Sequence, residues 1–397
     1  MCIRDRNRFL LILLFSAGEV VGATWNQFRG PTGQGHSFAD ELPLHWNIKQ
    51  GILWKAEIEG KAWSSPIEVG YQVVMSNAIR DANEESLILE AIALNISDGS
   101  VTWKKELFRY DSIPRIHGMN SHASPTPYFD GSCIYFHFVN LGTACLSTDG
   151  KIKWTKKIKY QPVHGSGSSP VIHNNHLILS IDGEINPSLI VLNKDNGDFL
   201  WKVRRQSNAK KNFSFCTPLV IDQDGRTQII SPASDYVFSY DLDGKQIWKS
   251  KYPGGYSVVP RPVYSNGIAY VSSGYDRPTL YAIRTDGVGE VTNSHVVWKS
   301  SKSVPRNSSP VLVNEYLFMA ADNGVVSCLN RFDGSQVWIH RVANSCSASL
   351  LHANGLIYLF PELKNLARSG FIHRFDKDTS GLLIVARTIE SYTELIR

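Results

Sequence analysis

The chain has few of the residues that build metal, redox and haem sites. Its 397 residues include only six cysteines, none of them in a Cys-x-x-Cys motif or an adjacent pair. This argues against a zinc ribbon, a dithiol redox motif and a c-type haem site. Cys133 and Cys145 are near enough in sequence to pair across a hairpin, but the number of cysteines beyond residue 23 is odd. We therefore expect buried free thiols rather than disulfides.

Further absences narrow the function. Lys and Arg form no block, and the formal charge of +5 is spread along the chain, so charge does not indicate nucleic-acid binding. No helical period is sustained between residues 24 and 360, which argues against an α-helical fold. The apolar run near the N-terminus is shorter than the ~20 residues that a membrane-spanning helix needs. The remaining composition, 43% apolar and 19% charged, is that of an ordinary globular protein.

The chain does contain an eleven-residue frame that keeps returning. It starts with a small or apolar residue, has Asp or Asn at position six and Gly at position seven, and ends with Trp. A stretched copy runs from Ala282 through Asp286-Gly287 to Trp298, six residues longer than the frame. Successive copies start 44 to 51 residues apart, which is the period of a β-propeller blade. The five regular copies are Ala93–Trp103, Ala144–Trp154, Val191–Trp201, Phe238–Trp248 and Cys328–Trp338.

Each repeat has the pattern of antiparallel strands. A Ser-Pro step with an apolar run precedes several frames, as at Ser169-Pro170-Val171, and a second apolar run such as Leu177-Ile178-Leu179 follows. The Asp-Gly or Asn-Gly step predicts a hairpin, because both central residues of a type I′ turn need positive φ. The frame's Trp then falls on the returning strand, where its indole can bury a large area and its N–H can reach a carbonyl. We expect such docking at Trp103, Trp154, Trp201, Trp248, Trp298 and Trp338.

These residues resemble the tryptophan-docking motif of the pyrroloquinoline-quinone (PQQ) type of β-propeller, Ala-x-Asp-x-x-Thr-Gly-x-x-x-Trp. The segments Trp25–Pro31 and Trp63–Pro66 further resemble secreted propellers of this family. The resemblance covers roughly residues 24 to 360. It implies an all-β fold, a β-propeller of six to seven four-stranded blades, incomplete at the C-terminus. Positions that depart from the motif are Asn95, Asn193 and Asn330 in place of Asp, and Leu146 and Tyr240.

The N-terminal residues have the features of a targeting segment. Three arginines precede the apolar run Phe9–Phe15, and Val21-Gly22-Ala23 has the small residues of a cleavage site. We therefore expect residues 1–23 to be a signal peptide and the propeller, residues 24–363, to be periplasmic or secreted. Residues 1–6 resemble translated sequencing adapter, and we treat them as artefactual.

Candidate ligand-binding residues precede the Ser-Pro steps, because in propellers of this type the first strand of each blade lines the central channel. If His117, His122 and His164 converge, they would form a site for an anion or a partner's side chain. The alternative to a ligand site is that the mouth of the channel is polar only because it is in contact with solvent. The candidates are Trp63, His117, Asn120, His122, His164, Arg261, Arg306 and Asn307.

A second pair of histidines is a further candidate for a metal site. His173 and His176 are three residues apart, but the intervening Asn174-Asn175 lies between apolar runs and predicts a hairpin turn. The two histidines are then expected to flank the turn, and we expect no metal there.

The resemblance carries two functional implications. Quinone-dependent dehydrogenases of this fold hold PQQ with calcium and use a catalytic Asp and adjacent cysteines. No such set can be placed in this sequence, so we expect no cofactor and treat a dehydrogenase as the alternative. The family also includes a propeller subunit of an outer-membrane-protein assembly machine. This implies a non-catalytic binding or assembly scaffold in the cell envelope, with a protein or peptide partner.

The last 34 residues, 364–397, change character. Gly370–Ala386 resembles the catalytic motif of ribosomal large subunit pseudouridine synthases, and the essential Asp of that motif maps onto Asp376. A competing interpretation is a further docking frame, since Arg374 lies 46 positions after Cys328, but no Trp follows. We expect a join between a propeller that has lost its last blade and a synthase fragment. Asp376 would then be inactive, because 34 residues cannot supply a pocket and an RNA-binding surface.

Overall fold

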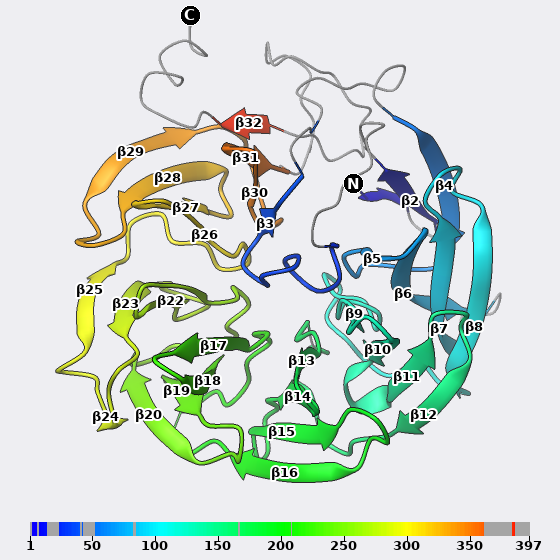
Figure 1. The fold of residues 1–397 in the computed structure, drawn as a ribbon, viewed down its shortest axis with the longest axis horizontal. Coiled ribbons are helices and arrows are strands. Elements are labelled where there is room, and N and C mark those ends of the chain that lie inside the picture. The colour runs from blue at the N-terminus through cyan, green and yellow to red at the C-terminus, as the bar shows by residue number, and fades with distance from the viewer. Residues whose placement is uncertain are drawn as a thin grey trace, which may run out of the picture.

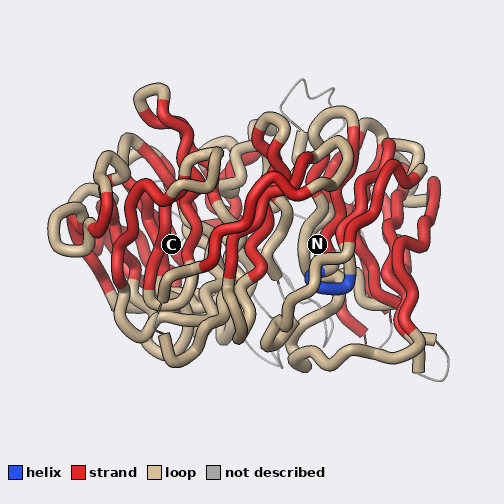
Figure 2. The backbone as a smooth tube through the Cα atoms, turned by 90° about the horizontal axis from the view of Figure 1, so that it is seen from below, coloured by secondary structure: helices blue, strands red, loops and turns tan. Residues whose placement is uncertain are grey.

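The computed structural model describes residues 24–39, 42, 52–81, 85–165, 167–207 and 209–360, and the backbone of strands at 2–5, 8–13 and 383–385. Within these residues the regular structure is β, apart from one 3-10 turn, η1 (Val139–Leu141). The sheets are arranged in a ring about a central axis (Figure 1). Seen from the side, their strands run between the two faces of a disc (Figure 2).

Six consecutive sheets are complete antiparallel blades, each with its first strand innermost and its fourth strand outermost (Figure 1). The repeat thus predicts the unit and its order along the chain. Blade 1 contains β5 (Ile67–Val69), β6 (Gln72–Arg80), β7 (Leu87–Asn95) and β8 (Val101–Tyr110). Blade 2 contains β9 (Tyr128–Phe129), β10 (Cys133–His137), β11 (Thr143–Ser147) and β12 (Ile152–Lys156). Blade 3 contains β13 (Val171–His173), β14 (His176–Ile181), β15 (Ser188–Asn193) and β16 (Phe199–Arg204).

The next three blades repeat this arrangement, with one addition. Blade 4 contains β17 (Leu219–Gln223), β18 (Arg226–Pro232), β19 (Tyr236–Tyr240) and β20 (Gln246–Lys251), and the short β24 (Gly289–Glu290) pairs with β20 in parallel. Blade 5 contains β21 (Val263–Ser265), β22 (Ile268–Ser272), β23 (Leu280–Arg284) and β25 (Val296–Ser300). Blade 6 contains β26 (Val311–Val313), β27 (Tyr316–Ala320), β28 (Val325–Asn330) and β29 (Gln336–Arg341).

The seventh sheet is assembled from distant parts of the chain. It contains β3 (His36–Ser37), β30 (Leu351–Ala353), β31 (Leu356–Leu359) and β32 (Leu383–Val385), with β3 parallel to β30. A separate sheet joins β1 (Cys2–Asp5), β2 (Arg8–Leu13) and β4 (Trp54–Glu59). No pairing joins β31 to β4 among the described strands, so the ring is not closed by a complete blade. This agrees with the expected propeller of six to seven blades that is incomplete at its C-terminal end.

Both ends of the chain bear on earlier expectations. β2 covers most of the apolar run expected in a signal peptide and pairs with β4, so that interpretation stays a prediction. The tail adds a strand to the last sheet through β32, as its apolar residues suggest. Asp376 lies outside the described residues.

All five cysteines beyond residue 23 are free and buried, as predicted.

The hydrophobic core lies between neighbouring blades. One cluster joins Val74 and Leu89 of blade 1 to Ile134 and Phe136 of blade 2. Similar clusters span blades 2 and 3, 3 and 4, 4 and 5, 5 and 6, and blade 6 with the seventh sheet. A single blade therefore has an unburied apolar face, and each repeat depends on its neighbours for a core.

The docking tryptophans connect each repeat to the next through its turn. Trp201 Nε1 donates a hydrogen bond of 2.7 Å to the carbonyl of Leu242 in the next frame. Its indole covers Gly244, whose φ is +82°, and a Cβ there would lie 2.8 Å from the ring. The frame's Gly is therefore needed for its left-handed backbone and for the close approach of the indole. Equivalent bonds join Trp103 to Thr148, Trp154 to Lys194 and Trp298 to Arg331.

Two predicted docking residues behave differently. Trp248 is fully buried, and its Nε1 donates to Gln228 Oε1 within its own blade at 2.9 Å. The stretched frame explains this difference, because its extra residues form β24 alongside β20 and displace the Gly287 turn from the indole. Trp338, in the last frame, packs on Phe318 of its own blade.

A tryptophan outside the frames also docks. Trp54 of β4 donates to the carbonyl of Ile96 at 2.7 Å and covers Gly99. β4 therefore occupies the position of the outermost strand of a blade that precedes blade 1, which is the position at which a ring would close. Sequence reasoning missed this docking because only the Trp, and not its frame, is present before Ala93.

Residues 25–37, which we call the strap, lie at the centre of the ring (Figure 1). The strap bonds to blades far apart in sequence. Phe129 N of blade 2 donates to the Asn26 carbonyl at 2.8 Å, and Tyr264 N of blade 5 donates to Gln34 Oε1 at 2.5 Å. The His352 N–H of the seventh sheet donates to the Gly35 carbonyl at 2.8 Å. The strap thus holds together a ring whose last blade is incomplete.

Two buried arginines anchor the strap. Arg29 donates to the carbonyls of Leu350 and Pro310, and Arg261 Nη1 donates to the carbonyl of Phe28 at 2.7 Å. Burial lowers the pKa of Arg29, and Arg261 lowers it further. Backbone carbonyls accept hydrogen bonds from both guanidinium groups, whereas Arg29 Nε is buried without a partner among the described residues. No salt bridge to either arginine is found in the described part of the chain.

Replacing Trp201 by Ala should lower the free energy of unfolding by about 3–5 kcal/mol, because it removes an indole that packs, partly buried, between blades 3 and 4 and also removes its hydrogen bond to Leu242. Phe199→Ala, on the same strand but half-exposed, is the matched control and should cost under about 1 kcal/mol. Urea unfolding measures both changes. Equal stability of the Trp201 variant and the unaltered chain would contradict the docking role.

Acid should weaken the contact between the strap and the seventh sheet. His36 Nδ1 lies 3.1 Å from His352 Nδ1, and burial, His352 and Arg29 together lower the pKa of His36 from 6.5 to about 4. Between pH 6.5 and 4 the unfolded chain takes up a proton that the folded chain does not, so folding stability falls as pH falls. His36→Asn should therefore lose less stability over this interval, by about 1–2 kcal/mol after allowance for partial exposure. Urea unfolding at pH 7 and pH 4.5 tests this, and an equal loss in both proteins would contradict it.

Candidate functional site

One face of the disc carries the loops that are least regular and richest in aromatic residues. Because the strands of each blade are antiparallel, all loops between blades emerge on the same face, together with the loop between the second and third strands. We call this the linker face. The frame turns that receive the docking tryptophans lie on the opposite face. The linkers are residues 111–127, 157–170, 205–218, 252–262 and 301–310.

Six rings follow one another across the linker face, and we call them the ring row. His117 packs edge-on against His164 at 5.2 Å between centroids, and His164 packs against Phe213 at 5.4 Å. Phe213 contacts Phe215 at 5.7 Å and Tyr256 at 5.6 Å, and Tyr256 contacts Tyr275 at 6.2 Å. The row therefore joins four successive linkers and the β22–β23 loop of blade 5.

Cations are positioned along the far half of the ring row. Lys211 Nζ lies 4.0 Å from the Tyr256 centroid and donates to its hydroxyl at 2.7 Å. The Tyr256 hydroxyl donates in turn to Asp276 at 2.8 Å. The Arg306 guanidinium lies 4.9 Å from the Tyr275 ring. Aromatic faces with cations above them suit a ligand that combines apolar and acidic groups.

The structure brings together part of the predicted site. Asn120 donates to the His164 carbonyl at 3.0 Å, and His117 and His164 share the ring contact. The pKa of His164 is lowered, by burial first and then by the positive charges of His117 and Arg115. Arg306 and Asn307 lie at the other end of the row, where the Arg306 N–H and the Asn307 side chain bond to Asp322 at 2.8 and 2.6 Å.

Three predicted residues lie elsewhere. His122 is buried, and its Nε2 lies 2.9 Å from the Pro114 carbonyl, so the expected set of three histidines contains only a pair in ring contact. Arg261 holds the strap from within the hub. Trp63 is half-buried against the core of blade 1, with Lys61 at 5.6 Å from its ring.

The second histidine pair flanks a turn, as predicted. His173 and His176 are register partners at the ends of β13 and β14, on either side of Asn174, whose φ is +52°. Within the described residues, no group of three or more His, Cys, Asp or Glu side chains is arranged to hold a metal ion.

Sequence reasoning missed most of the ring row. It named the two histidines but not Phe213, Phe215, Tyr256 or Tyr275. A signal was present, since Asn212-Phe213-Ser214-Phe215 and Tyr256 precede Thr-Pro and Val-Pro steps as the histidines precede Ser-Pro. Apolar residues in those positions were not weighed as ligand-binding groups.

A buried ion pair anchors the linker that carries the two phenylalanines. Arg205, the first residue of that linker, bonds to both oxygens of Asp182, at 3.0 and 3.2 Å, and to Ser231 Oγ at 2.7 Å. Both side chains are almost fully buried between blades 3 and 4. Burial raises the pKa of Asp182, and the attraction of Arg205 opposes that shift. This network fixes the start of the linker and so the place of the rings.

Comparison with known proteins identifies the family. A family model of PQQ-like repeats, described as outer membrane protein assembly factor BamB, matches residues 90–294 and 286–379. The chain belongs to this family. The PQQ-like propeller expected from the docking frames is therefore confirmed.

Solved structures agree on the fold. BamB from Moraxella catarrhalis is 13% identical with a TM-score of 0.51, covering 91% of this chain and 90% of that one. The quinohemoprotein alcohol dehydrogenase ADHIIG from Pseudomonas putida HK5 is 12% identical with a TM-score of 0.56, covering 85% of this chain and 76% of that one. At these identities the likeness is one of fold alone.

A different similarity involves a short stretch. Ribosomal large subunit pseudouridine synthase D from Pseudomonas aeruginosa is 43% identical over 58 residues, and that from Pasteurella multocida is 41% identical over 59. These stretches are 15% of this chain and 18% of each relative, so the chain spans under a fifth of their length. They exceed the 34 residues expected for the synthase-like tail, so the similarity is not confined to residues 364–397.

Breaking the buried ion pair should destabilise the PQQ-like propeller. Arg205→Met leaves Asp182 as an unpaired buried charge, which should cost about 3–5 kcal/mol of unfolding free energy. The double variant with Asp182→Leu should recover part of that loss, because neither charge is then buried. Asp149→Asn, in the exposed pair with Lys151, is the control and should leave the urea midpoint unchanged. A single variant as stable as the control would contradict the structural role of the pair.

Proposed function

We propose that this PQQ-like propeller is a non-catalytic binding scaffold of the cell envelope, and that its ring row holds a segment of a protein partner. The observation that carries the proposal is the row itself, six rings in successive contact across the linkers of four blade junctions. Clustered aromatic residues with Arg beside them are typical of the parts of interfaces that dominate binding energy.

The chemistry of the row indicates the kind of segment. Phe213 is buried, Tyr275 is exposed, and Lys211 and Arg306 lie over the tyrosines. Two apolar side chains, Met119 and Ile185, are exposed on loops of the same face. An extended segment with apolar and acidic residues would match these rings and cations.

The polar groups near the row support a binding role more than a catalytic one. The Asn120 side chain bonds to the His164 carbonyl and to Ser121 and Ser124, and the Asn307 side chain bonds to Asp322. These side chains hold the linkers in place, so they are committed to structure. The solved relative named BamB supports an assembly role by fold, and the family description points the same way.

A quinone-dependent dehydrogenase is the second candidate, because a solved alcohol dehydrogenase shares the fold. The described residues do not fit the cofactor. The strap lies at the centre of the ring, and the buried charged groups that hold it are Arg29 and Arg261 rather than carboxylates that could bind calcium. The five cysteines beyond residue 23 are separate and buried.

The third candidate, a pseudouridine synthase, rests on the short similarity and on Asp376, which lies outside the described residues. Deletion of residues 364–397 is expected to leave partner binding intact, because no residue of the ring row belongs to that tail.

The same comparisons support a location in the cell envelope. We propose a periplasmic or secreted protein, with residues 1–23 as its signal. Among the described residues, no helix is long and apolar enough to cross a membrane.

Site-specific crosslinking tests the proposed face. A photoreactive amino acid in place of Tyr275 should form crosslinks to a discrete partner in an envelope extract, because Tyr275 ends the ring row and is exposed. The same residue in place of Tyr71 is the control, since Tyr71 is 86% exposed in a turn on the opposite face. Tyr256→Ala should reduce the Tyr275 crosslink at least tenfold. Equal crosslinking from both positions, or none from Tyr275, would overturn the proposal.

A turnover assay separates the scaffold from the dehydrogenase. Addition of PQQ and calcium should give no dye-linked oxidation of alcohols or sugars, because the described residues supply neither the metal ligands nor a catalytic carboxylate beside them. Saturable turnover with either substrate class would contradict the scaffold assignment.

A further inference from the structure

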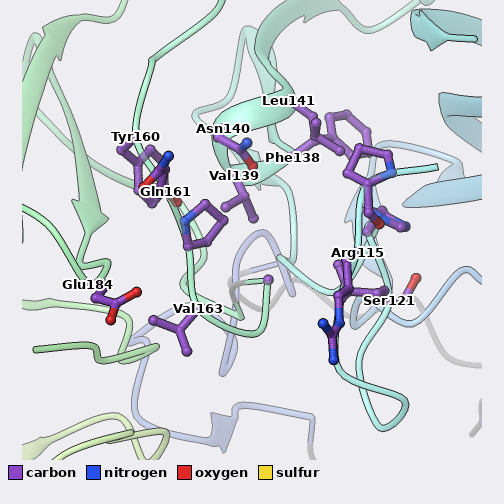
Figure 3. A pocket seen from close by; sticks show the side chains of 15 residues that line it. Arg115, Ser121, Phe138, Val139, Asn140, Leu141, Tyr160, Gln161, Val163 and Glu184 are labelled. Carbon is purple, nitrogen blue, oxygen red and sulfur yellow. The ribbon is translucent and has the colours of Figure 1, made fainter. Parts of the chain in front are cut away.

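A cavity of about 560 Å³ opens where the linkers on either side of blade 2 meet, and we call it the junction pocket. It lies beside the ring row but contains none of its rings. Its walls come from the linker at 114–122, the turn at 138–141, the linker at 160–165 and the loop that holds Glu184 (Figure 3). The volume is within the range of small-molecule sites, ~300–1,000 Å³.

Part of the lining of the junction pocket is apolar. This part contains Phe138, Val139 and Leu141, which are buried, together with Pro162 and Val163. The turn is held by Leu141, whose carbonyl accepts a hydrogen bond of 2.5 Å from the Tyr110 hydroxyl. An apolar side chain that enters here displaces water from both sides, which favours binding.

Val139 has an unusual backbone conformation. Its φ is +61°, in the left-handed region that β-branched residues strongly avoid. Strain of this kind is found mainly at ligand sites and switches, and it persists only where the surrounding structure imposes it. In this conformation the Val139 side chain forms part of the pocket wall.

The rim carries two opposite charges. Arg115 and Glu184 lie on opposite sides of the pocket (Figure 3), and both are exposed. Neither makes an ion pair with a described residue. His122 also lines the pocket, and burial is the main cause of its lowered pKa, so this imidazole is neutral at pH 7.

We propose that the junction pocket binds a small peptide zwitterion with an apolar side chain, of the size of a dipeptide. The carboxylate of the ligand pairs with Arg115 and its ammonium group pairs with Glu184. Its side chain rests on Phe138, Leu141 and Pro162. Opposite charges on two sides of a partly apolar cavity favour a molecule that carries both charges, since a capped molecule would make at most one of the two ion pairs. This site is independent of the partner proposed for the ring row.

Titration calorimetry with the dipeptide Ala-Phe tests the proposal on the full chain. The peptide should bind at one site, and its acetylated and amidated form should bind at least tenfold more weakly. Arg115→Gln should weaken Ala-Phe binding about tenfold, but it should leave the affinity for the C-terminally amidated peptide unchanged. Glu184→Gln should have the corresponding effect for the free ammonium group. Both residues are exposed, so the variants should fold, and Arg226→Gln on the opposite face is the charge-matched control.

Each outcome decides the matter. Weaker Ala-Phe binding by Arg115→Gln and Glu184→Gln, with the affinity of Arg226→Gln unchanged, supports the site. Absence of binding at 10 mM, which is roughly the limit of a useful small-ligand site, would overturn it. Equal binding of free and capped peptides, or equal loss in Arg226→Gln, would also overturn it. A positive crosslinking result on the ring row would stand in either case, because it uses other residues.

Discussion

The contact between a tryptophan and the glycine of the next repeat is the interaction on which the rest of this structure depends. The indoles that dock in this way cover a turn whose left-handed Gly has no Cβ, and their N–H groups donate to a carbonyl in that turn. They are Trp54, Trp103, Trp154, Trp201 and Trp298. The contact is directional, so it sets the angle between blades as well as their separation. Because a single blade leaves one apolar face exposed, this angle determines whether the next core cluster can form.

The position of the functional face follows from this arrangement. Docking contacts lie at the frame turns, and antiparallel strands place all linkers on the opposite face. The rings of the row therefore meet only if the blades are correctly rotated against one another. The strap adds a second constraint from the centre, since it bonds to the first, second, fifth and sixth blades and to the seventh sheet. Together these contacts keep the linkers in place around a ring that no complete blade closes.

Much of the fold could be predicted from the sequence because the information is local. The Asp-Gly step fixes the hairpin, and the returning Trp fixes the docking side, so six blades follow from six frames. Trp248 departs from the pattern for a local reason, the stretched frame after it. Trp54 could not be recognised by its frame, because its strand is separated in sequence from the sheet that it would complete.

The site was harder to predict because its contacts are long-range. Residues such as Arg261 and Phe28 are 233 positions apart, and nothing in the sequence links them. The histidines were found by their position before the Ser-Pro steps, yet whether they meet depends on the turn of each linker. His122 points to the Pro114 carbonyl, whereas His117 and His164 join the phenylalanines. The direction of each histidine side chain depends on how several loops pack together. This packing cannot be predicted from composition or residue spacing.

Hydrogen–deuterium exchange on the Trp201→Ala variant tests the central claim, that docking on one face positions the linkers on the other. The account predicts faster exchange at the turn around Gly244 and also in the linker at 205–218, with blade 1 unchanged. Faster exchange confined to β16 around position 201, with the turn and the linker unaffected, would contradict it.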